Sequence, residues 1–408
     1  MKSIDFRKML VLALKLCILG LLMGALGGLL GAAFSHTLSF ANSLRKSFPF
    51  IVVFLPLGGI ATVLLYRVLG MREYGGTNKI IQCLKSGNEI KPNAAPLIFV
   101  STAITHLFGG SAGKEGAAIQ LGGAFASALS KVFHLKDDER TVFVMSGMSA
   151  VFAGVFGTPL TAAVFILEFK SLRKILFLAI LPCLISAIVA KNVSSLLGVS
   201  AETMHINGSI SFSVSTALKI FALAVSISLL GMFMCFVFNK VKIWAKKLIT
   251  GAILRIIVGA VIIIALTALI GDMRYNGSGM DMAIKAVEGE AHWFDFAVKI
   301  LFTAITLAAG FKGGEIVPTF CIGATFGCFI GGVIGLDYGV AAAIGLIGLF
   351  CCATNSLLSA VLLGIELFGF SLLPYFMIVC IILWLLPDNK CLFENRFFRS
   401  PIFVKLKK

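Results

Sequence analysis

Charged residues are scarce in this sequence. Only 13% of the 408 residues are Asp, Glu, Lys or Arg, whereas a soluble domain carries about 25%. Hydrophobic residues make up 59% of the chain and the mean hydropathy is +1.01, so there is too little polar surface to cover a fold in water. The shortage of charge excludes an ordinary soluble protein. It predicts an all-α polytopic integral membrane protein that uses lipid as its solvent.

Residues that ligate metals or act as nucleophiles are also few or badly placed. The 5 His are scattered, and most of the 10 Cys lie inside apolar stretches without the spacing of metal ligands. Thiols in such stretches act as small hydrophobic groups. We therefore expect no metal, no cofactor and no disulfide framework. A membrane-embedded enzyme would need a nucleophile–base set or a metal cluster, so we expect that the protein is not an enzyme.

Acidic residues are outnumbered, since 35 Lys and Arg stand against 19 Asp and Glu and give a formal net charge of +16. The basic residues gather in short connections between apolar runs, such as Lys240–Lys247, and at both ends of the chain. This distribution follows the positive-inside rule rather than a nucleic-acid surface. We expect no nucleic-acid partner, and we expect both termini to be cytoplasmic.

Long apolar runs are abundant. We expect one transmembrane transport domain over residues 1–408, with halves near 1–200 and 201–408 and no soluble regulatory domain. The first run is longer than the apolar core of a signal peptide. The region Val317–Leu386 should hold about three spans, and the other predicted spans are Met9–Phe34, Phe48–Leu69, Val142–Phe169, Ile175–Val193, Phe212–Phe238, Leu254–Ile270 and Phe294–Ala309.

Two Gly-rich breaks interrupt the apolar pattern, Gly113–Gly116 and Gly313–Ile316, and each contains a central Glu. Downstream of each break lies a small polar turn that opens an apolar helix, over residues 157–168 and 355–366. Chance similarity could explain one such pair, but not readily two pairs in the same order. Broken helices at corresponding places in two halves indicate the substrate site of a transporter.

The chemistry of such a break favours an anion. Glycine lets an ion approach the backbone closely, and the helix that follows turns its positive end and its free N–H groups toward the break. When ionised, Glu115 can take the anion's place; when protonated, it leaves and carries a proton. The structural alternative is an ion pair between Glu115 and Lys114 at a membrane surface. A carboxylate within the membrane, however, usually indicates a functional site.

These motifs resemble the CLC family of chloride channels and anion/proton exchangers. The run from Gly113 to Gly123 is similar to the family's gating-glutamate motif, and Gly313–Pro318 is similar to its second anion-binding loop. The resemblance implies a homodimer and a fold of two inverted-topology halves with broken and re-entrant helices. It implies gating and proton transfer by Glu115 and Glu315, and anion binding by Gly76, Thr77, Gly113, Lys114, Gly116, Ala117, Gly314, Ile316, Val317 and Phe393.

Departures from the family pattern point to its fluoride/proton antiporter branch. The internal proton-relay Glu of the chloride exchangers falls at Phe169, and the family's late Tyr falls near Phe393, whose role could equally be packing. Glu315 adds an acid where chloride-type members have an apolar residue. A protonated carboxyl there could donate to fluoride, a strongly hydrated ion. The structural alternative for Glu315 is that it is capped by backbone groups or forms an ion pair with Lys312.

The sequence therefore predicts transmembrane anion transport coupled to protons, with fluoride as the anion, in a prokaryotic cell membrane. A chloride channel or chloride/H+ exchanger of the same fold stays open as the alternative. A purely structural scaffold would not need acids in two glycine breaks. Weaker site candidates are His106, Glu168, Glu366, Tyr74 and Asn78.

Overall fold

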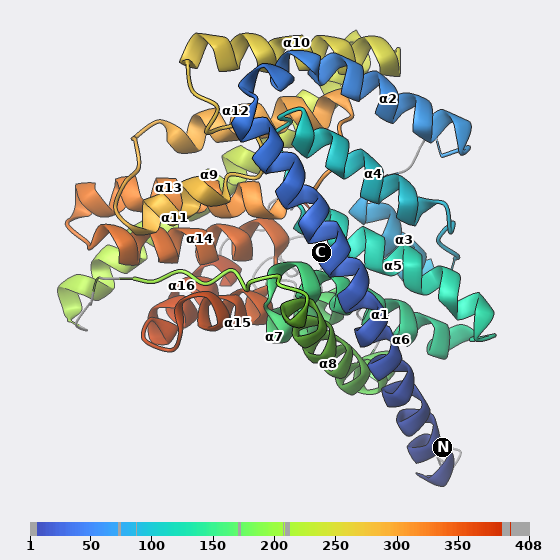
Figure 1. The fold of residues 1–408 in the computed structure, drawn as a ribbon. Coiled ribbons are helices and arrows are strands. Elements are labelled where there is room, and N and C mark those ends of the chain that lie inside the picture. The colour runs from blue at the N-terminus through green and yellow to red at the C-terminus, as the bar shows by residue number, and fades with distance from the viewer. Residues whose placement is uncertain are drawn as a thin grey trace, which may run out of the picture. The chain divides into compact units, whose positions relative to one another are not determined.

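The computed structural model describes residues 6–71, 75–86, 88–169, 173–206, 208, 213–385 and 392, and within them the regular structure is helical (Figure 1). The elements are α1 (Phe6–Ser47), η1 (Pro49–Phe54), α2 (Leu55–Val68), α3 (Thr77–Ser86), α4 (Ala94–Leu107), α5 (Glu115–Val132), α6 (Asp137–Phe156), α7 (Pro159–Glu168), α8 (Arg173–Leu196), α9 (Val214–Leu248), α10 (Ala252–Ile270), α11 (Met280–Val287), α12 (Asp295–Ala309), α13 (Ile316–Ile334), α14 (Tyr338–Thr354), α15 (Leu357–Phe368) and α16 (Leu373–Leu385).

Features of the helix pattern in α1–α8 recur in α9–α16. Each series opens with a long helix, of 42 residues in α1 and 35 in α9, and its third member is short, with 10 residues in α3 and 8 in α11. The junctions recur too. Gly157 after α6 and Asn355 after α14 both take the left-handed conformation, with φ of 83° and 54°, before a short apolar helix. The predicted repeat is thus confirmed in the helix pattern.

Two of the predicted spans are wrong in detail. The run Val142–Phe169 is two helices, α6 and α7, because Gly157 ends the first and Pro159 opens the second. The region Val317–Leu386 holds parts of four helices, α13 to α16, rather than three. Helices α3, α4 and α11 were not predicted, since they are short or only half apolar, whereas α5 is the helix expected to follow the first break. Among the described residues, six helical segments are long and apolar enough to cross a membrane.

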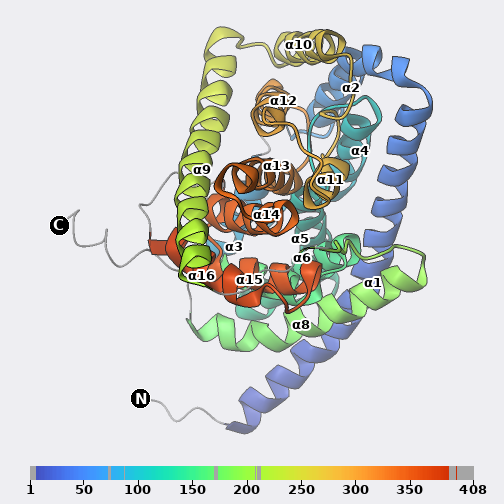
Figure 2. The ribbon, with the colours of Figure 1, turned by 90° about the vertical axis from the view of Figure 1, so that its left-hand side faces the viewer.

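The described residues form two compact units. Unit 1 takes in Met1–His36, Tyr74–Pro96 and Ala118–Glu202, and unit 2 takes in Thr37–Glu73, Leu97–Ala117 and Thr203–Lys408. In unit 1, α6 packs against α7 and α8. In unit 2, α13 packs along α14, and α9 runs beside α12, α13, α14 and α16 (Figure 2). Both glycine breaks belong to unit 2.

Glycine lets neighbouring helices approach backbone to backbone. In unit 2 a Cβ added at Gly323 on α13 would lie 2.4 Å from the carbonyl oxygen of Gly345 on α14, and a Cβ at Gly345 would lie 2.2 Å from the carbonyl of Gly323. Unit 1 contains the counterpart, where a Cβ at Gly122 on α5 would lie 2.2 Å from the carbonyl of Gly147 on α6. Small residues serve this purpose in membrane helices, where lipid gives apolar side chains no reason to associate.

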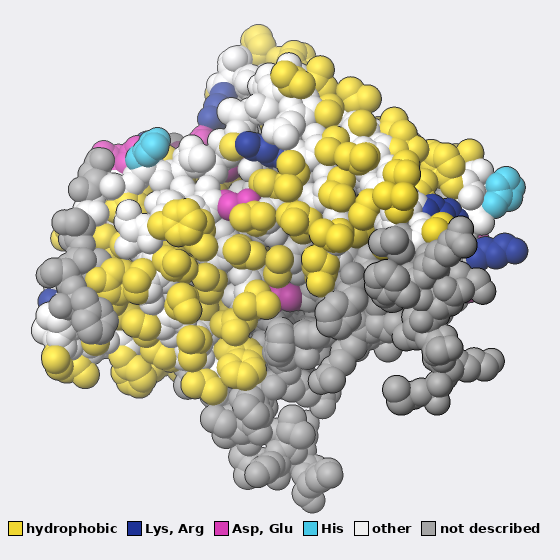
Figure 3. Space-filling view, turned by 90° about the horizontal axis from the view of Figure 1, so that it is seen from below, with side chains coloured by type: hydrophobic (Ala, Val, Ile, Leu, Met, Phe, Trp, Pro, Cys, Tyr) yellow, Lys and Arg dark blue, Asp and Glu magenta, His cyan; other side chains and the backbone are white. Residues whose placement is uncertain are grey.

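Large apolar side chains cover much of the outer surface. Leu218 on α9 and Leu269 on α10 are 65% and 82% exposed. The face in Figure 3 is dense in hydrophobic side chains and shows few charged ones. A soluble protein rarely exposes so much contiguous apolar surface. Such a surface is expected for an integral membrane protein.

We predict that Gly323→Ala lowers stability by about 1–3 kcal/mol, because the new methyl group meets a backbone carbonyl that cannot move aside. The measurement is the thermal unfolding of the purified protein in detergent. Gly332→Ala on the same helix is the matched control, since its methyl would meet only the ring of Tyr338, which is 54% exposed and can turn away. Equal melting temperatures for the two variants would contradict the close packing of α13 on α14.

Candidate functional site

The two glycine breaks are joined through their backbones. The N–H of Gly113 donates to the carbonyl of Gly314 at 2.7 Å, and the N–H of Gly314 donates to the carbonyl of Gly113 at 2.7 Å, which makes an antiparallel bridge. The bridge lies just before the first residues of α5 and α13. Two helices from distant parts of the sequence therefore begin at one place.

The two helix starts leave no room for a side chain on Gly113 or Gly314. A Cβ added at Gly314 would lie 2.5 Å from the amide nitrogen of Gly116, and one at Gly113 would lie 3.0 Å from Pro318 Cδ and 3.2 Å from Val317 Cβ. The first N–H groups of a helix have no acceptor within the helix, and they form its positive end. Two such ends side by side are suited to hold a small anion. The sequence-predicted residues Gly113, Gly116, Gly314 and Val317 are thus brought together.

Glu115 is the first residue of α5 and its side chain is fully buried. Its Oε2 lies close to Gly113, since a Cβ added there would be 2.9 Å from that oxygen. The carboxylate therefore folds back over the break, at the positive end of its own helix. Full burial argues against the alternative of an ion pair at a membrane surface, although Lys114 beside it is half-buried.

Glu315 is the N-cap residue of α13 and is half-buried. Its side chain forms no capping hydrogen bond, and no ion pair joins it to another described residue. The ammonium of Lys312 lies over the ring of Tyr66 instead, 4.5 Å from its centroid. Lys242 on α9 is the cation that acts on Glu315 electrostatically. The structure thus supports neither a cap nor a Lys312 ion pair as the reason for this acid.

Hydroxyl groups fix the segment that leads into the first break. The N–H of Ser111 donates to Thr306 Oγ1 at 3.0 Å, and Ser111 Oγ is hydrogen-bonded to Thr303 Oγ1 at 3.0 Å. Two hydrogen bonds therefore fix Ser111 to α12. Thr105 on α4 serves both breaks, because its carbonyl accepts from Gly110 N–H at 2.8 Å and its hydroxyl accepts from Lys312 N–H at 3.3 Å. The two breaks share one hydrogen-bonded support.

Two buried cations near the first break were missed by the sequence analysis. Arg45, near the end of α1, donates to the carbonyl of His106, and Lys299 on α12 donates to the carbonyls of Tyr275 and Gly277 at 2.9 and 2.8 Å. Lys299 is completely buried and Arg45 is 6% exposed. The signal for Lys299 was present, because a charge inside an apolar run indicates a functional or paired residue.

Gly76 and Thr77 lie in unit 1, at the start of α3. Gly76 takes φ of 66°, in the left-handed region that favours glycine. The Oγ1 of Thr77 accepts a hydrogen bond from Gln120 Nε2 at 3.0 Å. Phe169 is the C-cap residue of α7, and its ring centroid lies 4.8 Å from that of Phe165.

Phe393 and Tyr74 lie outside the described residues. Within the described residues, no group of three or more His, Cys, Asp and Glu could hold a metal ion.

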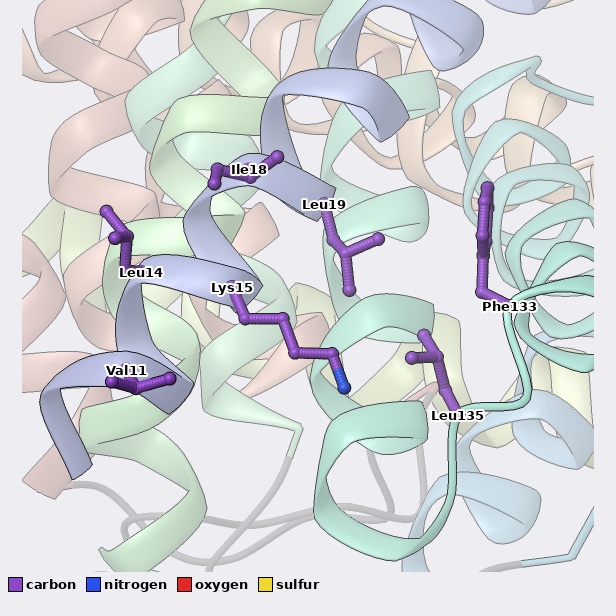
Figure 4. Close-up of a pocket in the computed structure, with 7 residues that line it drawn as sticks. All are labelled: Val11, Leu14, Lys15, Ile18, Leu19, Phe133 and Leu135. Carbon is purple, nitrogen blue, oxygen red and sulfur yellow. The ribbon is translucent and has the colours of Figure 1, made fainter. Parts of the chain in front are cut away.

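An open groove of about 400 Å³ lies in unit 1, along the N-terminal part of α1 (Figure 4). Its lining is apolar apart from Lys15, whose ammonium is paired with Glu139 at 2.8 Å. A neutralised cation in an apolar groove offers no site for a small anion. The other lining residues are Val11, Leu14, Ile18, Leu19, Phe133 and Leu135.

The chain is similar in sequence to known proteins. A curated relative, the "Chloride/fluoride channel protein" of Pseudomonas syringae pv. tomato, is 33% identical over 375 residues, which cover 90% of this chain and 83% of the relative. An "H(+)/Cl(-) exchange transporter" of Vibrio parahaemolyticus is 24% identical over 393 residues, which cover 86% of this chain and 81% of the relative.

The chain is also similar to solved structures. The crystal structure of a CLC-type fluoride/proton antiporter matches with a TM-score of 0.87 at 31% identity, over 94% of this chain and 96% of that one. A slow cyanobacterial Cl-/H+ antiporter matches in fold, with a TM-score of 0.74 at 18% identity, over 90% of this chain and 93% of that one. The family model described as voltage gated chloride channel matches residues 57–385. The chain therefore belongs to the CLC family of chloride channels and anion/proton antiporters.

Proposed function

We propose that this protein exchanges fluoride for protons across a prokaryotic cell membrane. The observation that carries the proposal is the half-buried carboxyl group of Glu315, which stands at the start of α13 beside the backbone bridge of the two breaks. An acid without a cap or an ion pair costs solvation free energy in such a place. Donation to an anion, or transfer of a proton, accounts for its presence.

The proposed cycle depends on competition at one positive site. The N-termini of α5 and α13 attract one negative charge, and this can be the carboxylate of Glu115 or an anion. Both together would repel each other, so the arriving anion favours protonation of Glu115. The protonated side chain leaves the site with its proton and returns as a carboxylate when the anion has gone. One side chain thus couples the two fluxes.

Fluoride is favoured over chloride by the donors available. Fluoride is small and strongly hydrated, so a site that takes it from water must supply strong hydrogen-bond donors. A protonated Glu315 is one such donor, placed next to the backbone N–H groups of Ile316 and Val317. The relatives that share 31–33% identity with the chain carry fluoride in their names. Chloride/H+ exchange is the alternative, and the Vibrio relative's name is its support.

We place the whole chain in one transport domain, with both basic termini in the cytoplasm and two copies forming a homodimer. Leu358 on α15 and Met377 and Ile381 on α16 are exposed, at 50%, 46% and 44%, and would suit contact with lipid or with a second copy. No cofactor is part of the proposed cycle.

Flux from liposomes tests the function directly. The purified protein is reconstituted into liposomes of phosphatidylethanolamine and phosphatidylglycerol, and the liposomes are loaded with fluoride and chloride. Efflux is followed with electrodes for both ions and a pH probe. We expect fluoride efflux at least about tenfold faster than chloride efflux, a difference of about 1.4 kcal/mol between the two barriers, accompanied by proton uptake. Efficient chloride flux with negligible fluoride flux would reject the fluoride proposal and favour the chloride alternative.

We predict that Glu115→Gln abolishes proton movement and preserves or speeds fluoride flux. Glutamine has the shape of the protonated acid but cannot titrate, so the gate stays open and no proton is carried. Glu288→Gln, at an exposed position on the surface of unit 2, is the control and should leave both fluxes unchanged. Protons still driven uphill by a fluoride gradient in Glu115→Gln would show that another residue carries them.

We predict that Glu315→Ala slows fluoride turnover at least about tenfold, or about 1.4 kcal/mol in barrier height, without unfolding the protein. Combining it with Lys312→Ala should restore nothing, because Lys312 packs on Tyr66 rather than pairing with Glu315. The measurement is initial fluoride efflux from the same liposomes, with size-exclusion profiles as the check on folding. Recovery of transport in the double variant would mean that Glu315 serves only to neutralise Lys312.

A further inference from the structure

The loop between α10 and α11 is bound to the segment that leads into the first break. The side-chain amide of Asn276 donates to the carbonyl of Gly109 at 2.8 Å, and the N–H of Gly277 donates to the carbonyl of Gly110 at 3.1 Å. Gly110 is three residues before Gly113, whose backbone bridges the two breaks. A displacement of this loop would therefore be passed on to the start of α5.

Two buried cations hold this loop. Lys299 donates from its ammonium to the carbonyls of Tyr275 and Gly277, at 2.9 and 2.8 Å. Arg45 lies against the same loop, since a Cβ added at Gly277 would be 2.8 Å from its Nη2, and it also donates to the carbonyl of His106 at the end of α4. The loop therefore has two cationic neighbours, and one of them, Arg45, also joins it to the end of α4.

The carboxylates in the neighbourhood are engaged elsewhere. Asp295, one turn before Lys299 on α12, accepts from the Tyr275 hydroxyl at 2.5 Å and from the His292 N–H at 2.9 Å. It also lies 3.8 Å from the guanidinium of Arg274.

Asp281 is the carboxylate that acts on Arg45 electrostatically. It is exposed and pairs with Lys46 at 2.7 Å. The described contacts of Lys299 are therefore with carbonyl oxygens, and no described carboxylate forms an ion pair with it.

Holding two carbonyl groups with a buried positive charge costs more solvation free energy than holding them with a neutral donor. A neutral amide could donate the same hydrogen bonds with a far smaller loss of solvation, whereas a buried ammonium without a counter-ion loses several kcal/mol. The charge itself is then the feature that needs a function. The field of this charge acts in a protein interior, where screening by salt is weak. The charge lies against the loop that is hydrogen-bonded to the segment before the first break.

We propose that Lys299, assisted by Arg45, is a positioning residue that raises the affinity of the paired breaks for a small monovalent anion. It holds the loop Tyr275–Gly277 against Gly109–Gly110 and adds positive potential at the site, so that an anion is favoured there before it displaces Glu115. The inference rests on the proposed transport function but not on the choice between fluoride and chloride.

Three variants in liposomes test the assignment: Lys299→Gln, Lys299→Arg and, as matched control, Lys219→Gln. Lys219 also donates to a backbone carbonyl, that of Gly335 at 2.8 Å, but on the exposed surface of unit 2. Efflux is measured against anion concentration, for fluoride and for chloride, to separate KM from the maximal rate. The anion that the wild type carries is used for the comparison.

We expect Lys299→Gln to raise the KM about three- to tenfold, because the loss of a buried positive charge weakens the attraction for an anion, with the maximal rate changed less than about twofold. Lys299→Arg and Lys219→Gln should keep the wild-type KM. A lowered maximal rate with an unchanged KM in Lys299→Gln would overturn the proposal, because it would mean that the residue only shapes the loop.

Arg45→Gln is the second variant, since Lys299→Gln could fail to fold. It should raise the KM in the same direction, and an unchanged KM there would also contradict the proposal. Failure of fluoride selectivity in the wild type is a separate result. It would reject the proposed function in favour of chloride, while the KM comparison with chloride still decides the role of Lys299.

Discussion

The reciprocal hydrogen bonds between Gly113 and Gly314 constrain everything else at the site. They use the N–H and the carbonyl of both residues, and they bring the starts of α5 and α13 so close that a Cβ on Gly314 would lie 2.5 Å from the nitrogen of Gly116. Glycine is required because the backbones touch. The N–H groups that open the two helices are left to face whatever occupies the site, and a negative charge suits them best.

Charge around this bridge is distributed in a consistent way. The acids stand at the helix starts, with Glu115 fully buried and Glu315 half-buried, and the buried cations Arg45 and Lys299 stand behind the supporting loops. The acids can each take up a proton, whereas the cations are held by carbonyl oxygens. In the proposed cycle the mobile charges are the anion and the protons, and the fixed positive charge keeps the site attractive to one anion at a time.

The sequence was sufficient for the features that depend on local pattern. The two breaks, the repeat around Gly157 and Asn355 and the position of Glu115 at a helix start all follow from glycine, small polar residues and apolar runs, and the structure has them. The span predicted over Val142–Phe169 was wrong because hydropathy does not register a one-residue helix stop. The small polar turn before Pro159 had already predicted the second helix, which conflicts with one continuous span.

Other features depend on partners that are distant in the sequence. The cation–π contact of Lys312 with Tyr66 removes the ion pair that proximity to Glu315 had suggested. The bonds from Lys299 to the carbonyls of Tyr275 and Gly277 require a loop geometry that no local pattern encodes. Only the presence of a Lys in an apolar run could have directed attention there.

The central claim is that an anion and the proton-carrying Glu115 alternate at one site, and the reversal of transport measures this alternation. Protein in liposomes is given a fixed tenfold fluoride gradient, and an opposing pH gradient is varied until net fluoride movement stops. Alternation at one site predicts that an opposing pH gradient can stop net fluoride movement, so that a fluoride gradient can also drive protons uphill. Net fluoride movement that depends on the fluoride gradient and the membrane potential alone, and that no pH gradient stops, would contradict it.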